Sequence, residues 1–330
     1  MTHPTPRLAA IIGSGLAGMI AGYAFPGVPI YESSPAPPTP HRAVLRFRSD
    51  VVSRLTGIPF RRVRVRKGIW FQGQFREPNI RLANLYSRKC LDRVAGDRSI
   101  WDIDAVDRWV APETLAEQMT EHLASRIQLG CAIDFGELGA RCRGTRPGYA
   151  SCVLSTAPLA SSLAALELSP TLMPSLVRAP IWVRRYRLPV ADAHQTVYFP
   201  DQGISTYRAS LTGSLLTVEM RDDAQDSSME EDLGVVAHAF GIARDSLEPI
   251  DSEGAAHQRY GKIVPLEAAE RRGLLAALTL RAGIYSLGRF ATWRNVLLDD
   301  VVADTEVIRG MLLAGAANRD YAALRASAER

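Results

Sequence analysis

A glycine-rich turn near the start of the chain constrains the fold most. Residues 8–32 read as an apolar run, the turn Gly13-Ser-Gly-Leu-Ala-Gly18, a short helical stretch and a second apolar run. This order predicts a βαβ unit that binds a dinucleotide. Gly13 permits the tight turn, Gly15 lets backbone N–H groups approach a pyrophosphate, and Gly18 lets the helix pack on the sheet.

An acidic residue at the end of the second apolar run strengthens this interpretation. Glu32 follows Gly13 by 19 positions, the place from which a carboxylate binds the ribose hydroxyls of the adenosine half. A 2′-phosphate would be repelled there, so NADP is disfavoured. The helix that begins after the turn would face the pyrophosphate with its N-terminus. The alternative is an ordinary glycine turn between a strand and a helix.

Basic residues concentrate in one segment. Residues 42–98 hold 15 Lys and Arg against 4 Asp and Glu, a net charge of +11 in a chain of net charge +4. Within it, residues 61–67 alternate arginine with valine, so a strand would send Arg62, Arg64 and Arg66 to one face. Such a face either binds phosphates, including those of DNA, or is a solvated surface. The sequence leaves both interpretations open.

Length and composition set the broad class. The 330 residues exceed what one hydrophobic core usually serves, so two interleaved domains are expected. No apolar run reaches the roughly 20 residues of a membrane span, so we expect a cytoplasmic protein without membrane contact. Cys90, Cys131, Cys142 and Cys152 form no CxxC pair. They are expected to be reduced thiols, and no metal site is expected.

The first half of the chain mixes several expected elements. Residues 43–109 contain short β-like runs at 61–65 and 68–72, unlike a continuing βαβ unit. Apolar residues at helical spacing predict a helix over 112–128. A strand is expected at 131–135.

The second half returns to a similar pattern. Residues 151–158 read as a buried strand that ends in a turn. Residues 180–220 alternate apolar and polar positions, which predicts an antiparallel sheet. A helix is expected over 233–240, after an acidic stretch. The chain then repeats its opening, with a strand and glycine turn over 283–289 and an amphipathic helix over 299–313.

Five motifs spread over nearly the whole chain carry a family resemblance. They are Gly13-Ser-Gly-Leu-Ala-Gly18 with Glu32, Val153-Leu-Ser-Thr-Ala-Pro158, Tyr198-Phe-Pro with Ser205-Thr-Tyr-Arg208, Tyr260-Gly-Lys-Ile-Val-Pro265, and Gly288-Arg-Phe-Ala-Thr-Trp-Arg294 before Asp299-Asp300. In this order the pattern resembles UDP-galactopyranose mutase and the wider amine-oxidase-like group of FAD enzymes. The chain is shorter than such mutases, and it lacks the arginine and double glycine that often follow their first βαβ unit.

The resemblance implies an α/β fold with a Rossmann-like FAD-binding domain of the GR2 type and an inserted antiparallel-sheet substrate domain. Residues 1–45, 110–160 and 275–330 would form the FAD-binding domain. Residues 46–109 and 161–274 would form the cap or substrate domain. A dinucleotide motif so close to the first residue is typical of FAD enzymes, so FAD is the expected cofactor.

The resemblance also implies a set of cofactor contacts. The final Gly-Arg turn and the helix after it would lie against the flavin and the pyrophosphate, and His41 would lie near the pyrophosphate. The expected FAD contacts are Gly13, Gly15, Leu16, Ala17, Gly18, Glu32, Ser33, Arg42, Gly288, Arg289 and Asp300.

Three residues are candidates for substrate chemistry. A buried Lys262 would orient water near the flavin. Arg208, together with Tyr207, would bind a substrate carboxylate or phosphate, because a guanidinium matches either group. Tyr198 and Tyr260 would line the pocket with their rings. For each residue the alternative is an ordinary place in the core, in the sheet or on the surface.

Three functions follow as alternatives. The first is an FAD-dependent oxidoreductase or lyase that acts on a C–N bond of an amine or an amino-acid-type substrate. Residues 41–110 are similar to flavin-dependent lyases of tailed bacteriophages that act on an aminoacylated thymine in DNA, which would imply DNA contact through residues 42–98 in the host cytoplasm. The second is a sugar-nucleotide mutase. The third is a nucleotide-binding protein without catalysis.

Overall fold

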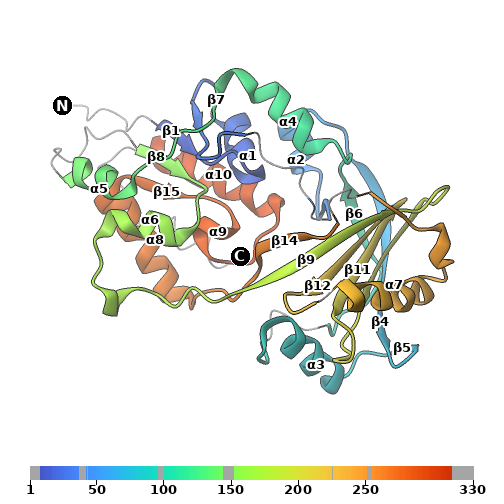
Figure 1. Ribbon diagram of the computed structural model, residues 1–330. Helices are drawn as coiled ribbons and strands as arrows, with labels where there is room; N and C mark the ends of the chain where they lie inside the picture. Colours follow the sequence, from blue (N-terminus) through green and yellow to red (C-terminus); the bar gives the residue numbers. More distant parts are fainter. Residues whose placement is uncertain are drawn as a thin grey trace.

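Two sheets organise the chain into two lobes, which lie side by side in Figure 1. A five-stranded sheet forms one lobe and a ten-stranded sheet forms the other. The computed structural model describes residues 8–36, 42, 44–95, 100–143, 152–224, 226–250 and 254–313.

The smaller sheet is parallel throughout. Its strand order is β15-β8-β1-β2-β7, with every neighbouring pair parallel. Parallel strands need crossover connections, and the helices of this lobe lie in those connections, apart from the two that follow the last strand. The strands are β1 (Leu8–Ile12), β2 (Ile30–Tyr31), β7 (Ile127–Gln128), β8 (Cys152–Ser155) and β15 (Ile284–Ser286).

Helices cover both faces of the parallel sheet. One core joins the sheet to α1 (Leu16–Ala24), α2 (Val51–Thr56), α4 (Leu115–Leu123) and α10 (Leu298–Leu313). A second core joins the other face to α5 (Phe135–Arg143), α6 (Leu159–Ser162), α8 (Ala268–Ala282) and α9 (Arg289–Thr292). This three-layer arrangement confirms the expected α/β class.

The larger sheet is mixed. Its main path is β13-β9-β12-β11-β10-β4-β6-β3, with β14 beside β9 and β5 beside β4. Its neighbours are antiparallel except for β4 and β10, which run parallel. The strands are β3 (Arg46–Phe47), β4 (Arg61–Phe71), β5 (Gln74–Arg76), β6 (Val106–Val110), β9 (Arg178–Arg187), β10 (Ala193–Tyr198), β11 (Thr206–Gly213), β12 (Leu215–Arg221), β13 (Glu248–Pro249) and β14 (Ala256–Ile263).

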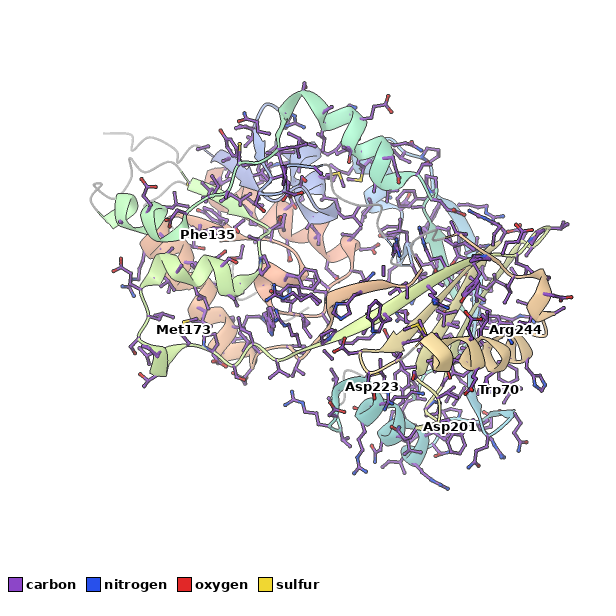
Figure 2. All side chains as sticks on the ribbon, viewed as in Figure 1. Trp70, Phe135, Met173, Asp201, Asp223 and Arg244 are labelled. Carbon is purple, nitrogen blue, oxygen red and sulfur yellow. The ribbon has the colours of Figure 1, made fainter. Side chains whose placement is uncertain are left out.

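Two helices pack on opposite faces of the larger sheet. The helix α7 (Asp226–Phe240) shares a core with β10, β11 and β12, and α3 (Ile80–Leu91) shares another with β4 and β9. Figure 2 labels Trp70 in this lobe and Phe135 in the lobe of the parallel sheet. The strands of the larger sheet come from the segments between β2 and β7 and between β8 and β15. The domain boundaries expected from the sequence stay a prediction.

Two of the expected elements of the first half are wrong. The helix expected over 112–128 ends at Leu123, because Ile127 and Gln128 pair with β2 as strand β7. Residues 131–134 form no strand, and α5 begins at Phe135. The Asp134 carboxylate accepts the Glu137 N–H at 3.0 Å, which stabilises the start of this helix.

Two further boundaries differ from the expectation. The runs at 61–65 and 68–72 are one strand, β4, because Arg66 and Lys67 continue the pairing with β10. The helix expected over 233–240 begins earlier, at Asp226, so part of the acidic stretch is helical. The late strand, glycine turn and helix are confirmed as β15, α9 and α10. Over the described residues, every helix is too short or too polar to cross a bilayer.

Candidate active site

A cavity of about 1490 Å³ lies between the two lobes. It exceeds the roughly 300–1,000 Å³ of an ordinary small-molecule site. Its lining includes the ends of β1 and β2, the start of α1 and the turn before α9 on the side of the parallel sheet. Strands β4, β6, β10, β11 and β14 line it on the side of the larger sheet. This volume leaves room for a dinucleotide together with a substrate.

Two glycines of the first turn are required by the packing of the protein itself. Gly13 has a φ of +93°, and a Cβ there would lie 2.5 Å from Thr156 Oγ1. A Cβ at Gly18 would overlap the carbonyl oxygen of Gly13. The turn therefore packs tightly between the end of β8 and helix α1, as the sequence predicts for these two positions.

Gly15 is different, because nothing in the protein requires a glycine there. Its φ of −64° and ψ of 175° suit any L-residue. A Cβ at this position would meet no protein atom within 4 Å. Gly15 is exposed and lines the cavity at the N-terminus of α1. The open space in front of it fits a group that approaches the backbone from outside the protein, as a pyrophosphate does.

Glu32 lies at the end of β2 and lines the cavity. Its carboxylate accepts the Ser14 N–H at 2.9 Å and the Ser34 N–H at 2.9 Å, and the hydroxyls of Ser14 and Ser33 donate to it as well. Burial alone would raise the pKa of Glu32, but these hydrogen bonds lower it below its ordinary value. The side chain is therefore an ionised acceptor at the cavity, and its bond to Ser14 fixes the glycine turn.

The late Gly-Arg turn reaches the same cavity. Gly288 has a φ of +87°, and a Cβ there would lie 2.7 Å from the Cβ of Ala17 on α1. Gly288 and Arg289 line the cavity together with Gly15. Two motifs more than 250 positions apart in the chain therefore meet at one site. A guanidinium N–H of Arg289 also donates to the carbonyl of Gly261 on β14, at 3.3 Å.

Not every expected FAD contact lies at the cavity. Leu16, Ala17, Ser33 and Arg42 line it. Asp300 does not: it pairs with Arg48 and accepts the Leu297 N–H at 2.8 Å, which stabilises the start of α10. Its contacts within the protein are structural, and its expected contact with FAD stays a prediction. His41 lies outside the described residues.

The strands of the larger sheet present alternate residues to the cavity. Because side chains alternate across a strand, one residue in two faces this side. Lys67 of β4 faces the cavity, whereas Arg62, Arg64 and Arg66 are exposed on the opposite face. The cavity-facing pairs are Val65 and Lys67, Val106 and Arg108, Thr196 and Tyr198, and Arg208 and Ser210.

One acidic residue offsets part of the charge on the exposed basic face of β4. Arg62 and Arg64 both pair with Asp107, at 2.6 and 3.2 Å. Arg61, at a position of the opposite side in the alternation of β4, binds Asp192 through two N–H groups. This face therefore carries less uncompensated charge than the sequence suggests, and it lies across the sheet from the cavity.

A buried ionic cluster lies behind the cavity wall. A β-bulge in β11 sets both Tyr207 and Arg208 opposite Glu219 of β12. Arg208 binds the Glu219 carboxylate through two N–H groups, and the Tyr207 hydroxyl donates to it at 3.1 Å. Lys262 Nζ lies 3.9 Å from the same carboxylate.

The charges of the two basic residues control the ionisation of Glu219. Burial alone would raise its pKa, but the charges of Arg208 and Lys262 and the bonds from Arg208 and Tyr207 lower it to about 2. Glu219 is therefore an anion at neutral pH and balances part of the charge of its two neighbours.

This cluster gives Tyr207 and Arg208 partners within the protein, and their expected roles in binding substrate stay predictions. Tyr207 is 1% exposed and does not line the cavity. Arg208 lines it, but its guanidinium already binds a carboxylate, that of Glu219. Lys262 lines the cavity as expected, with Nζ 4.4 Å from the centre of the Tyr207 ring. Tyr198 and Tyr260 also line it.

Sequence reasoning missed three charged residues of the site. The sequence did contain a sign that Glu219 is functional, because its carboxylate lies between Val218 and Met220 in an apolar strand. Arg46 and Arg108 had none. Arg46 lies in β3, whose position on the cavity wall depends on pairing with β6. Arg108 lies in β6, whose position depends on pairing with β4.

The fold has known relatives among solved structures. No protein-family model matches the sequence, and no curated protein matches it either. Reduced UDP-galactopyranose mutase superposes with a TM-score of 0.63 at 15% identity, over 95% of this chain and 98% of that one. HpxO of Klebsiella pneumoniae, complexed with FAD and uric acid, superposes with a TM-score of 0.51 at 15% identity, over 98% and 84% of the two chains.

A third likeness is to a geranylgeranyl bacteriochlorophyll reductase-like protein of Thermoplasma acidophilum. Its TM-score is 0.52 at 10% identity, over 98% of this chain and 82% of that one. At these identities the likeness concerns the fold. The chain therefore shares its mixed α/β fold with a mutase, a reductase-like protein and a protein solved with FAD.

Proposed function

We propose that this protein is an FAD-dependent enzyme. The observation that carries the proposal is Gly15, a glycine that neither backbone conformation nor packing requires and that borders open space at the start of α1. Glu32 and the Gly288 turn border the same cavity. Together they offer what FAD needs: a helix N-terminus for the pyrophosphate, a carboxylate for the ribose, and a large space beyond them.

For the reaction we propose the oxidation or cleavage of a C–N bond in an amine or an amino-acid-type substrate. When bound, FAD supplies the acceptor for a hydride from the carbon next to nitrogen. The chain's own residues would orient the substrate and exclude water. Lys262, 4% exposed at the cavity wall, has N–H groups that can orient a water molecule.

A sugar-nucleotide mutase is the second candidate. The likeness to UDP-galactopyranose mutase favours it, because the superposition spans nearly all of both chains. The non-catalytic alternative, a nucleotide-binding protein, requires the same cofactor side of the cavity but no use of the larger sheet.

A DNA-borne amine is a narrower form of the first candidate. The net charge of residues 42–98 supports it. The position of Arg62, Arg64 and Arg66 across the sheet from the cavity favours a small substrate instead. Binding of duplex DNA at increasing salt would separate the two forms, because contacts with phosphates weaken steeply as salt rises.

The first experiment measures FAD binding to the purified chain and to Gly15→Ala. We expect the wild type to bind FAD and the variant to lose about tenfold or more in affinity, because its methyl group would occupy the space before the helix. Gly273→Ala is the matched control, since a Cβ there also meets no atom within 4 Å, but Gly273 does not line the cavity. A wild type that binds no FAD, or equal binding by Gly15→Ala, would overturn the proposal.

The second experiment separates the candidate reactions. A flavin band at about 450 nm that bleaches anaerobically with amines would support C–N oxidation. Affinity for UDP without bleaching by amines would favour the mutase. A bound flavin that responds to none of these ligands would favour the non-catalytic alternative.

A further inference from the structure

The residues that line the cavity carry a large excess of positive charge. Among the described residues that line it, seven are Lys or Arg, and Glu32 is the one Asp or Glu. Arg42 and Arg289 lie on the side proposed for FAD. The other five basic residues lie on strands of the larger sheet.

Three of those five have an acidic partner in the protein. Arg208 and Lys262 share Glu219. Lys67 Nζ lies 3.6 Å from Asp102 Oδ2. Their charges are therefore at least partly balanced by carboxylates of this chain.

Arg46 and Arg108 have neutral partners. Arg46 donates to the hydroxyls of Thr212 and Thr196, at 2.9 and 2.8 Å, and to backbone carbonyls. Arg108 donates to the backbone carbonyl of Asp107 at 2.8 Å. Within the described part of the chain, neither guanidinium has a carboxylate within salt-bridge distance.

Arg46 lies within reach of the positive charges of both Arg208 and Arg108. Burial, together with the charges of Arg208 and Arg108, lowers the pKa of Arg46 to about 10. The same three positive charges act on the phenol of Tyr198, opposing the rise in its pKa that burial causes. The three arginines and Tyr198 therefore form one cluster, the arginine floor.

We propose that the arginine floor binds an oxyanion of the substrate, a carboxylate or a phosphate, with Arg108 as its direct partner. Half-buried positive charges without a carboxylate carry a desolvation cost, and an incoming anion offsets it. Arg46 is held by its hydroxyl and carbonyl partners, so it contributes charge from a fixed position. Arg108 keeps most of its N–H groups for a ligand, since one of its five is engaged by Asp107.

This inference deepens the proposed function, on which it rests for calling the anion part of the substrate. It replaces the sequence-based expectation that Arg208 binds the acid group. Arg208 is instead a positioning residue, since Glu219 fixes its guanidinium. A substrate with an acid group and an amine would place the acid group at Arg108 and leave the amine free to face the proposed flavin.

The test is calorimetric titration of the FAD-loaded protein with inorganic phosphate and, in a second arm, with acetate at constant ionic strength. We expect saturable binding of at least one anion, weakened about tenfold or more in Arg108→Gln and less in Arg108→Lys. The preferred anion identifies the acid group as phosphate or carboxylate. The matched control is Arg64→Gln, which removes the same charge from the opposite face of the sheet and should bind as the wild type does.

Three results would overturn the inference: no saturable binding of either anion, equal binding by wild type and Arg108→Gln, or an equal loss in Arg64→Gln. Unfolding midpoints of all variants exclude a folding defect, and Arg108→Lys provides a second variant that keeps the charge. FAD affinity is measured separately and should be unchanged in Arg108→Gln. A chain that binds no FAD but binds phosphate through Arg108 would refute the proposed function and leave the anion site standing.

Discussion

The two sides of the cavity are built on different principles. On the side of the parallel sheet, one short stretch of chain supplies a glycine turn, a helix N-terminus and Glu32. On the side of the larger sheet, charged side chains come from β3, β4, β6, β11 and β14, which lie far apart in the sequence. The first side offers mainly backbone groups, and the second offers mainly charged side chains.

This difference has an energetic consequence. Backbone N–H groups carry partial charges and need no counter-ion, so the first side requires only clearance and a fixed turn. Full charges at a half-buried wall require compensation, and Glu219 supplies it for Arg208 and Lys262. We therefore expect substitutions on the second side to affect stability more than substitutions on the first.

The largest expected effect is at Glu219. Glu219→Ala leaves two positive charges without their carboxylate and should lower the free energy of unfolding by about 3–5 kcal/mol. Urea unfolding measures it. The control is Glu117→Ala on the exposed face of α4, which should change the stability by less than about 0.5 kcal/mol. Similar values for the two variants would contradict the comparison.

The second effect is the acid sensitivity that Glu219 confers. Its pKa is about 2 in the folded chain against an ordinary 4.5, so folding favours its ionised form. The resulting stabilisation is complete above pH 4.5 and is lost as the pH falls toward 2, a change of about 3 kcal/mol. Urea unfolding between pH 6 and pH 3 should show a steeper loss in the wild type than in Glu219→Gln. Equal slopes would mean that this carboxylate does not titrate as described.

The smallest of the three effects is at Gly18, on the side of the parallel sheet. Gly18→Ala would force the turn away from α1 and should cost about 1–3 kcal/mol of stability. Gly273→Ala in α8 should be neutral or stabilising, because alanine favours a helix where space is open. A cost at Gly18 larger than that at Glu219 would reverse the ranking of the two sides.

The difference between the two sides of the cavity also explains which parts of the site could be predicted from the sequence. The turn at Gly13–Gly18, Glu32 and the Gly288 turn are local patterns whose spacing is fixed by backbone geometry, and the structure brings them to one cavity. The arginine floor depends on strand pairing between distant segments, which local spacing does not encode. Asp300 shows the limit of assigning a role by position in a motif, since its carboxylate accepts the Leu297 N–H at the start of α10 and does not line the cavity.

Local sequence patterns also failed to predict the structure of segments whose conformation depends on pairing with a neighbouring strand. Ile127 and Gln128 continue the helical spacing of α4, yet the open edge of β2 takes them as a strand. Over residues 180–220 the strands are antiparallel to one another as expected, but β10 also pairs in parallel with β4, a strand from a distant segment of the chain. Neither result follows from the propensities of the residues concerned.

The parallel pairing of β4 with β10 has a consequence for how the molecule is made. Thr196 and Tyr198 of β10 pair with Lys67 and Ile69 of β4, across about 130 residues of intervening chain. During synthesis, the edge of β4 that pairs with β10 therefore stays unpaired until β10 has been synthesised. Contacts between such distant residues form slowly, and an unpaired edge recruits strands of other molecules. Nascent chains that stall before β10 should consequently be the species that depends most on chaperones.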